Sequence, residues 1–201
     1  MNIRHKTTAV IFTVLSVLTA CAMLIIGVQL LLDARINETA ETSRRAARVF
    51  IVIENLVSEL ERTTSDYAAW DDTRQFVEVS NENYIHANLI DETFLHNRFA
   101  FMLFLDTQGK LVHGAGYDPD AGRSTAPPQG LMDKLSPGSP LLRDNATDPV
   151  SGILVIPEGS FLVSSYPILT SRFEGPSKGT LVIGQKLDTQ ITALRARLTQ
   201  L

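Results

Sequence analysis

The residues best suited to bind a ligand are concentrated between positions 65 and 90 of this 201-residue chain. The stretch holds the only tryptophan, two tyrosines and several acidic residues. On a helix, residues four apart share a face, so the hydroxyl of Tyr84 and the amide of Asn88 would face one small polar ligand. Pockets combine apolar walls with a few convergent polar groups. We therefore predict five ligand-binding residues: Trp70, Asp72, Tyr84, Asn88 and Ser165.

The four predicted residues from this stretch also have a purely structural interpretation. Trp70 could pack its helix on a sheet, and Asp72 and its neighbour Asp71 could cap a helix or accept hydrogen bonds from loop amides in a buried network. Tyr84 and Asn88 could tie their helix to the edge of the sheet. Ser165 and the residue after it belong to one strand, so they face opposite sides of the sheet. Only one of them can face a given pocket.

The same residues are poorly placed for catalysis or metal binding. Asp71 and Asp72 are adjacent, so on a helix their side chains point about 100° apart. The four histidines lack metal-ligand spacing, and the only cysteine, Cys21, lies in an apolar run. No phosphate-binding loop or nucleophile motif occurs, and a net charge of −4 excludes a nucleic-acid binder. We predict a non-enzymatic domain without a cofactor, a metal or a nucleic-acid partner.

An uncharged run near the N-terminus indicates that the domain is held at a membrane. Thr7 to Leu32 contains 26 residues without a charged residue or histidine, and as a helix it spans about 39 Å against about 30 Å for a bilayer core. The apolar core of a cleaved signal is shorter, about 7–15 residues. Residues 18–21 resemble a lipobox, but cleavage there would cut the apolar run in half. We expect a cytoplasmic tail over residues 1–6 and a transmembrane helix over 7–32.

A long stalk helix is predicted to follow the membrane helix, because no glycine occurs between Gly27 and Gly109 and no proline before Pro119. Apolar residues at alternating steps of three and four form a heptad seam that strengthens from Phe50 onward. One interpretation is a parallel homodimer held by this seam. The other is a single amphipathic helix that packs on its own domain. The predicted seam residues are Phe50, Ile53, Val57 and Leu60.

The second half of the chain is predicted to form an antiparallel sheet, because it holds 11 of the 12 glycines and all nine prolines. Asp106 to Gly109 is a hairpin turn, with glycine where positive φ is needed. Residues 118–149 are too long for a simple connection, so we expect a ligand or partner loop with a short helix at 131–135. An exit helix is expected over 188–201. The five predicted strands are 99–105, 110–117, 152–156, 161–166 and 180–187.

Several of these features resemble the CHASE4 domain, an extracytoplasmic sensory module of bacterial transmembrane receptors. The resemblance rests on the block from Tyr67 to Asp72 followed by Phe76, on Tyr84-Ile85 and Asn88-Leu89, and on the Asp106–Gly109 hairpin. The predicted order of a long helix, short helices, five antiparallel strands and an exit helix is that of an α+β fold. The resemblance implies a PAS-like five-stranded sheet behind a long N-terminal helix, held between two membrane helices. It also implies a bacterial inner-membrane protein whose sensor faces the periplasm or the outside.

Two functions fit these expectations. The first is a small-molecule sensor over residues 33–187 that acts as a homodimer and binds a ligand of unknown identity. In the resembling family, a HAMP linker and then a histidine kinase or cyclic-di-GMP enzyme follow a second span. This sequence stops at Leu201, before such a span, so we expect the output beyond it. The alternative is a single-span membrane-anchored periplasmic interaction or assembly protein without signalling.

Overall fold

The computed structural model describes residues 3–136, 138–143 and 148–188, with side chains described for 15–29 and, within those ranges, from 50 onward. The chain divides into two units, residues 1–52 and 53–201. The described part of the first unit is helical throughout, as part of helix α1 (Ile3–Ala68). No helix among the described residues has the length and hydropathy needed to cross a membrane. The transmembrane segment over 7–32 therefore stays a prediction.

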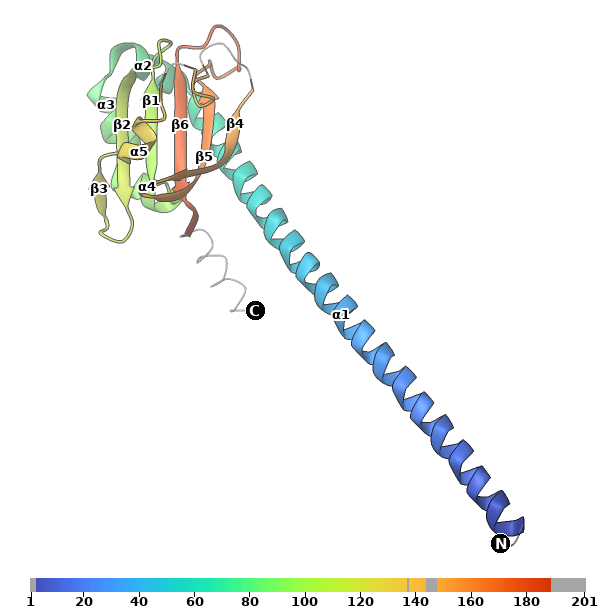
Figure 1. The fold of residues 1–201 in the computed structure, drawn as a ribbon. Helices are drawn as coiled ribbons and strands as arrows, with labels where there is room; N and C mark the ends of the chain where they lie inside the picture. Colours follow the sequence, from blue (N-terminus) through green and yellow to red (C-terminus); the bar gives the residue numbers. More distant parts are fainter. Residues whose placement is uncertain (1–2, 137, 144–147, 189–201) are drawn as a thin grey trace. The chain divides into compact units, whose positions relative to one another are not determined.

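The second unit contains an antiparallel sheet of six strands in the order β3-β2-β1-β6-β5-β4 (Figure 1). The α+β class is confirmed, but the prediction of five strands is wrong. The additional strand is β3, three exposed residues that pair with the end of β2 inside the predicted loop 118–149. A strand so short, without apolar alternation, has no sequence signature. The strands are β1 (Phe101–Leu105), β2 (Leu111–Asp118), β3 (Arg123–Thr125), β4 (Val150–Ile156), β5 (Gly159–Pro167) and β6 (Thr180–Lys186).

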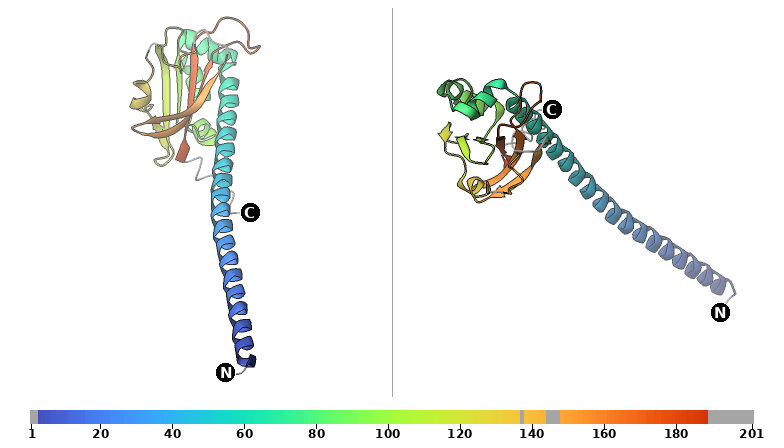
Figure 2. Two further views of the ribbon diagram at one scale, coloured as in Figure 1. Left: turned by 45° about the vertical axis from the view of Figure 1, so that its right-hand side comes forward. Right: turned by 90° about the horizontal axis from the view of Figure 1, so that it is seen from above.

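Helices cover one face of this sheet, and a largely irregular segment covers the other (Figures 1 and 2). The helix face carries residues 53–68 of α1 together with α2 (Asp71–Val79), α3 (Glu82–Asn88) and α4 (Asp91–Asn97). The opposite face, here called the loop face, carries the described residues 126–136 and 138–143 with the single turn α5 (Gln129–Met132). Helix α4 had no clear signal in the sequence, because seven residues give only one buried position, Phe94.

Strand β1 lies at the centre of the sheet, and all five of its residues are buried. Met102 and Phe104 belong to the core on the helix face, whereas Phe101, Leu103 and Leu105 belong to the core on the loop face. Since both faces are covered, the strand is apolar throughout instead of alternating. This accounts for the continuous apolar run in the sequence.

The hairpin between β1 and β2 forms as predicted. Gly109 adopts a φ of 75°, and the carboxylate of Asp106 accepts hydrogen bonds from the backbone N–H groups of Gln108 and Lys110 at 2.8 and 2.9 Å. An aspartate that satisfies turn amides in this way fixes the register of the two strands.

The predicted stalk seam is buried at Leu60 and exposed at Phe50. Leu60 is 1% exposed and lies in the core on the helix face, and Val57 packs against that core. Ile53 is half-buried, and Phe50 is 70% exposed. Packing on the helix's own domain therefore accounts for Val57 and Leu60. The homodimer stays a prediction, and Phe50 is the most exposed of its four predicted seam residues. Residues 189–201 of the predicted exit helix lie outside the described residues.

Candidate functional site

Tyr84 is embedded in the core on the helix face. Its ring stacks on Phe76 with centroids 4.4 Å apart, and its hydroxyl lies 2.7 Å from the hydroxyl of Thr73. Burial raises the pKa of Tyr84 to about 12. The hydroxyl that was predicted to contact a ligand is thus already paired inside the core.

The other three predicted residues from this part of the chain also have local partners or face solvent. Asn88 donates to the backbone carbonyl of Tyr84 at 3.2 Å. Trp70 precedes the first turn of α2, half-buried, with its ring 4.5 Å from that of Tyr67. Asp72 is exposed in the first turn of α2, where a negative charge favours the helix N-terminus.

Ser165 lies on the loop face, so the structure does not bring the five predicted ligand residues together. Its hydroxyl is buried and donates to the carbonyl of Leu141 at 2.5 Å. Residue spacing locates a side chain on one face of a helix or strand, but it does not reveal whether the polar group is already used. The hydroxyls of Tyr84 and Ser165 and the amide of Asn88 all have partners within the domain. The bonds of Tyr84 and Asn88 go to α2 and to their own helix, and not to the edge of the sheet as their structural interpretation had it.

One side of α2 is hydrogen-bonded to the connection between β5 and β6. Asp71 accepts hydrogen bonds from the backbone N–H and hydroxyl of Ser171 at 3.1 and 2.9 Å. These bonds hold the pKa of the Asp71 carboxyl below its usual value. The interpretation of these acids as acceptors for loop amides therefore holds for Asp71.

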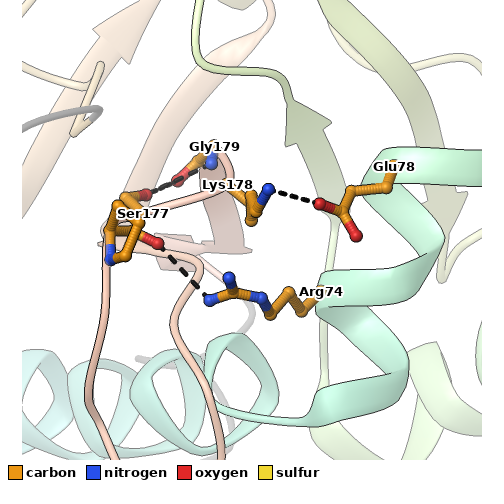
Figure 3. Close-up of polar contacts among 6 residues, drawn as sticks. Arg74, Glu78, Ser177, Lys178 and Gly179 are labelled. Atoms are coloured by element: carbon orange, nitrogen blue, oxygen red, sulfur yellow. Dashed lines mark hydrogen bonds and ion pairs between the residues drawn. The ribbon is translucent and has the colours of Figure 1, made fainter.

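Two further residues of α2 extend this contact along the same helix side (Figure 3). Arg74 donates to the carbonyl of Pro176 at 3.4 Å, and Glu78 pairs with Lys178 at 2.5 Å. The Lys178 ammonium lowers the pKa of the Glu78 carboxyl. Residues 71, 74 and 78 are separated by three and four positions, so they share one face of the helix. We call this arrangement the α2 clamp.

A cavity of about 490 Å³ opens on the other side of the molecule, between residues 134–136 and 138–141 and strand β4. Among the described residues that line it, the charged one is Lys134, and the hydroxyls of Ser136, Ser139 and Ser151 are the other polar side-chain groups. Leu141, Leu154 and Val163 form apolar wall. The volume is within the roughly 300–1,000 Å³ typical of small-molecule pockets. No predicted site residue lines it, but its cover belongs to the segment expected to be a ligand or partner loop.

The segment that covers this cavity, residues 134–136 and 138–143, is here called the cover, and it is hydrogen-bonded to strands β5 and β6. Ser165 of β5 donates to the carbonyl of Leu141, and the hydroxyl of Thr180 in β6 accepts from the backbone N–H of Arg143 at 2.8 Å. Both hydroxyls are buried. A displacement of residues 141–143 would therefore act directly on β5 and β6.

The described residues contain no group of histidine, cysteine or acidic side chains that could hold a metal ion. Within the same ranges, every buried side-chain nitrogen or oxygen has a hydrogen-bond partner. Candidate ligand sites in the described residues are therefore the cavities at the surface, since no buried polar side-chain group there lacks a partner.

A helix-backed antiparallel sheet with a loop-covered cavity defines an α+β domain. The chain matches the CHASE4 domain over residues 52–201, and it belongs to the CHASE4 family. It is also 32% identical, over 163 residues, to the methanogenesis regulatory histidine kinase FilI of Methanothrix harundinacea (strain 6Ac). That alignment covers 81% of this chain and 18% of the relative.

Two solved structures have a similar fold. The extracellular domain of vpHK1S-Z8, described as a histidine kinase, aligns with a TM-score of 0.55 at 14% identity, over 74% of this chain and 57% of that one. A domain of a sensory box/GGDEF family protein from Vibrio parahaemolyticus aligns with a TM-score of 0.50 at 13% identity, over 72% and 58%. At these identities the likeness is one of fold.

Proposed function

We propose that this chain is the small-molecule-binding, extracytoplasmic sensor of a membrane-anchored signalling receptor with a histidine kinase output. Membership of the CHASE4 family and the similarity to a histidine kinase support the class of protein. The cavity under residues 134–136 and 138–141 is the proposed ligand site. Residues 7–32 are the proposed anchor, between a cytoplasmic tail over 1–6 and a periplasmic domain over 33–187. A cyclic-di-GMP enzyme is the alternative output.

One observation carries the ligand part of this proposal: the cover of the cavity is hydrogen-bonded to β6 through Thr180. A ligand that contacts the cover prefers one of two positions of residues 141–143, and that preference shifts the population of states. Strand β6 then transmits the shift toward residue 188. Since Lys134 is the charged residue among the described ones that line the cavity, the ligand is a small anion or a polar molecule with hydroxyl groups.

A thermal-shift screen of the full chain in detergent, with organic acids, amino acids and polyamines, tests this proposal. We expect at least one organic acid or amino acid to raise the melting temperature, and Lys134→Gln to abolish the rise. Lys110→Met is the matched control, since Lys110 is exposed and does not line the cavity. Ligand binding at this cavity is disproved if every rise that the screen finds is the same in Lys134→Gln, or if no compound produces one.

The membrane and dimer parts of the proposal need separate tests. An alkaline phosphatase fusion after residue 188 would be active if the domain is exported, and inactive if it is not. Phe50→Asp with Ile53→Asp should reduce chemical crosslinking of membrane-bound dimers, whereas Glu54→Asp should not. Unchanged crosslinking would exclude the seam. An exported, monomeric chain that answers no ligand would favour the anchored interaction or assembly protein.

A further inference from the structure

A second cavity lies at one end of the sheet, where β2 and β6 end and β1 begins (Figure 1). Its volume is about 320 Å³, within the roughly 300–1,000 Å³ typical of small-molecule pockets. Its lining includes Ala100 just before β1, Lys186 at the end of β6 and Glu158 in the turn between β4 and β5. We call it the end cavity. It has no described lining residue in common with the larger cavity beside β4, so the two are separate sites.

The charged side chains that line the end cavity are mainly acidic. Among the described residues, the carboxylates belong to Asp118, Asp120 and Glu158, and the ammonium group belongs to Lys186. The Lys186 ammonium lies 4.0 Å from the carboxylate of Asp120, whose side chain is 88% exposed. An exposed ion pair of this kind is weak. The described lining therefore favours a ligand that carries positive charge.

Asp118 and Glu158 are held in position by backbone amides. One oxygen of Asp118 accepts hydrogen bonds from the N–H groups of Asp120 and Ala121 at 2.9 and 3.2 Å. One oxygen of Glu158 accepts from the N–H group of Gly130 at 2.9 Å. These bonds use a single oxygen of each carboxylate, so the second oxygen remains able to accept from a ligand. A carboxylate fixed in this way loses little conformational entropy when it binds.

Tyr117 adds an independent observation, because it is nearly buried and its hydroxyl has no partner. The residue is 8% exposed, and its ring stacks on Phe94 with centroids 6.1 Å apart. Among the described residues, nothing forms a hydrogen bond with its hydroxyl. Every fully buried side-chain oxygen in those residues has a partner, so this hydroxyl reaches accessible space. Tyr117 lines the end cavity and the smaller cavity that adjoins it, and its hydroxyl is available to a ligand there.

The acids of the end cavity do not converge on one point as the ligands of a metal ion would. No group of histidine, cysteine or acidic side chains in the described residues could hold a metal ion. A ligand that meets separate carboxylates is extended, and Phe161 provides an apolar wall for its body. The Phe161 ring is almost fully buried and lies 5.6 Å from that of Phe101, measured between centroids. The core behind this wall therefore holds it in position.

From these features we propose that the end cavity binds a small linear diamine. One ammonium group contacts the carboxylate of Asp118 and the other contacts that of Glu158, while the hydrocarbon chain lies against Phe161. The hydroxyl of Tyr117 accepts a further hydrogen bond from the ligand. Three carboxylates and one ammonium group leave two negative charges among the described lining residues. A ligand with two positive charges is complementary to them.

Such a ligand would act on the segment that leads into the cover of the larger cavity. Glu158 already accepts from Gly130 in α5. A Cβ added to Gly130 would lie 2.6 Å from the Glu158 carboxylate, so α5 and the turn between β4 and β5 are in close contact. The cover begins two residues after α5 ends. A diamine bound at Glu158 therefore stabilises α5 against this turn and restricts the cover.

Isothermal titration of the full chain in micelles of a neutral detergent tests this proposal, with the heats from protein-free micelles subtracted. The probe is putrescine, a linear diamine, and it is compared with butanediol, its neutral counterpart of similar shape. We expect putrescine to bind at least about tenfold more tightly than butanediol. Equal affinity for the two compounds would overturn the proposal, as would no binding of putrescine at about 10 mM.

Variants of the same size locate the site. Asp118→Asn and Glu158→Gln each remove one charge but keep an oxygen for the backbone amides, so both should fold and each should weaken putrescine binding about tenfold. Tyr117→Phe should weaken it about threefold. Asp106→Asn is the matched control, since Asp106 also accepts from backbone amides and does not line the cavity. Unchanged binding in both Asp118→Asn and Glu158→Gln would place the diamine elsewhere and overturn the proposal.

The larger cavity is tested separately with the same probe. Lys134→Gln should leave putrescine binding unchanged, because Lys134 does not line the end cavity. A changed affinity in Lys134→Gln alone would place putrescine in the larger cavity and overturn the proposal. Failure here leaves the proposed receptor function intact, because that function depends on the other cavity.

Discussion

The two faces of the sheet differ in how completely the chain fills them. On the helix face, the rings of Phe76, Tyr84 and Phe104 lie 4.4–5.8 Å apart, and the buried hydroxyls of Thr73 and Tyr84 pair with each other. On the loop face, a proline- and glycine-rich cover leaves a cavity of about 490 Å³ against β4. Helices bring large side chains into mutual contact at regular spacing, whereas an irregular cover does not. One sheet thus supports a rigid core and a space for a ligand.

Truncation of one phenylalanine on each face should give the largest effect and should differ between the faces. Phe76 is fully buried and contacts three rings, those of Tyr84, Phe104 and His113. Phe76→Ala should lower the free energy of unfolding by about 3–5 kcal/mol. Phe161 is also buried, but it borders a cavity of about 320 Å³. Phe161→Ala should cost less, about 2–3 kcal/mol, because part of that ring lacks packing partners already.

Urea denaturation of both variants measures the difference, with Val79→Ala as a control on the exposed side of α2. We expect the control to change stability by less than about 0.5 kcal/mol. Equal losses for the two phenylalanines would mean that the faces are packed alike, and the comparison would fail.

A glycine in the inner strand β6 and a glycine in the edge strand β4 provide a second contrast. A Cβ added to Gly184 in β6 would lie 2.0 Å from the ring of Phe101, whereas one added to Gly152 in β4 would meet no atom within 4 Å. Gly184→Ala should destabilise the domain by about 1–3 kcal/mol through overpacking. Gly152→Ala should be neutral or stabilising by up to about 1 kcal/mol, because alanine restricts the unfolded chain. Thermal melts of the two variants check both values, and an undiminished melting temperature in Gly184→Ala would contradict the close approach of the Phe101 ring to Gly184.

The sequence predicts the sheet better than it predicts the site, for a physical reason. The β1–β2 hairpin and the opposite facing of Ser165 and Tyr166 follow from local turn chemistry and from the period of two in a strand. The partner of Tyr84 is Thr73, eleven residues away on another helix. Such pairing depends on how α2 and α3 pack, which spacing within one helix does not contain. Strand β3 and helix α4 are short and have too few buried residues to produce a periodic pattern.

Removal of one hydroxyl from each face should separate a structural bond from one that controls the cavity cover. Tyr84→Phe leaves the buried hydroxyl of Thr73 without its partner and should cost about 1–2 kcal/mol. Ser165→Ala should cost a similar amount and also release residues 141–143, since its partner is the carbonyl of Leu141. Hydrogen exchange should therefore speed up at residues 139–143 in Ser165→Ala and stay unchanged there in Tyr84→Phe. Equal exchange in the two variants would show that Ser165 does not hold the cover.

The smallest effect is expected at the α2 clamp, where the groups are exposed. Hydrogen bonds from Ser171 lower the pKa of Asp71, and Lys178 lowers that of Glu78. Both folded-state pKa values lie below those of the unfolded chain, so the clamp contributes fully above about pH 5 and its contribution is lost as the pH falls through the lowered values. The backbone amide of Ser171 donates to Asp71, so its hydrogen exchange, corrected for the intrinsic rate, should lose protection only below about pH 4. At neutral pH, Asp71→Asn should lose part of that protection, whereas Asp72→Asn, a neighbouring exposed acid, should not. If both variants exchange alike, the connection between β5 and β6 is held by its own turn and not by α2.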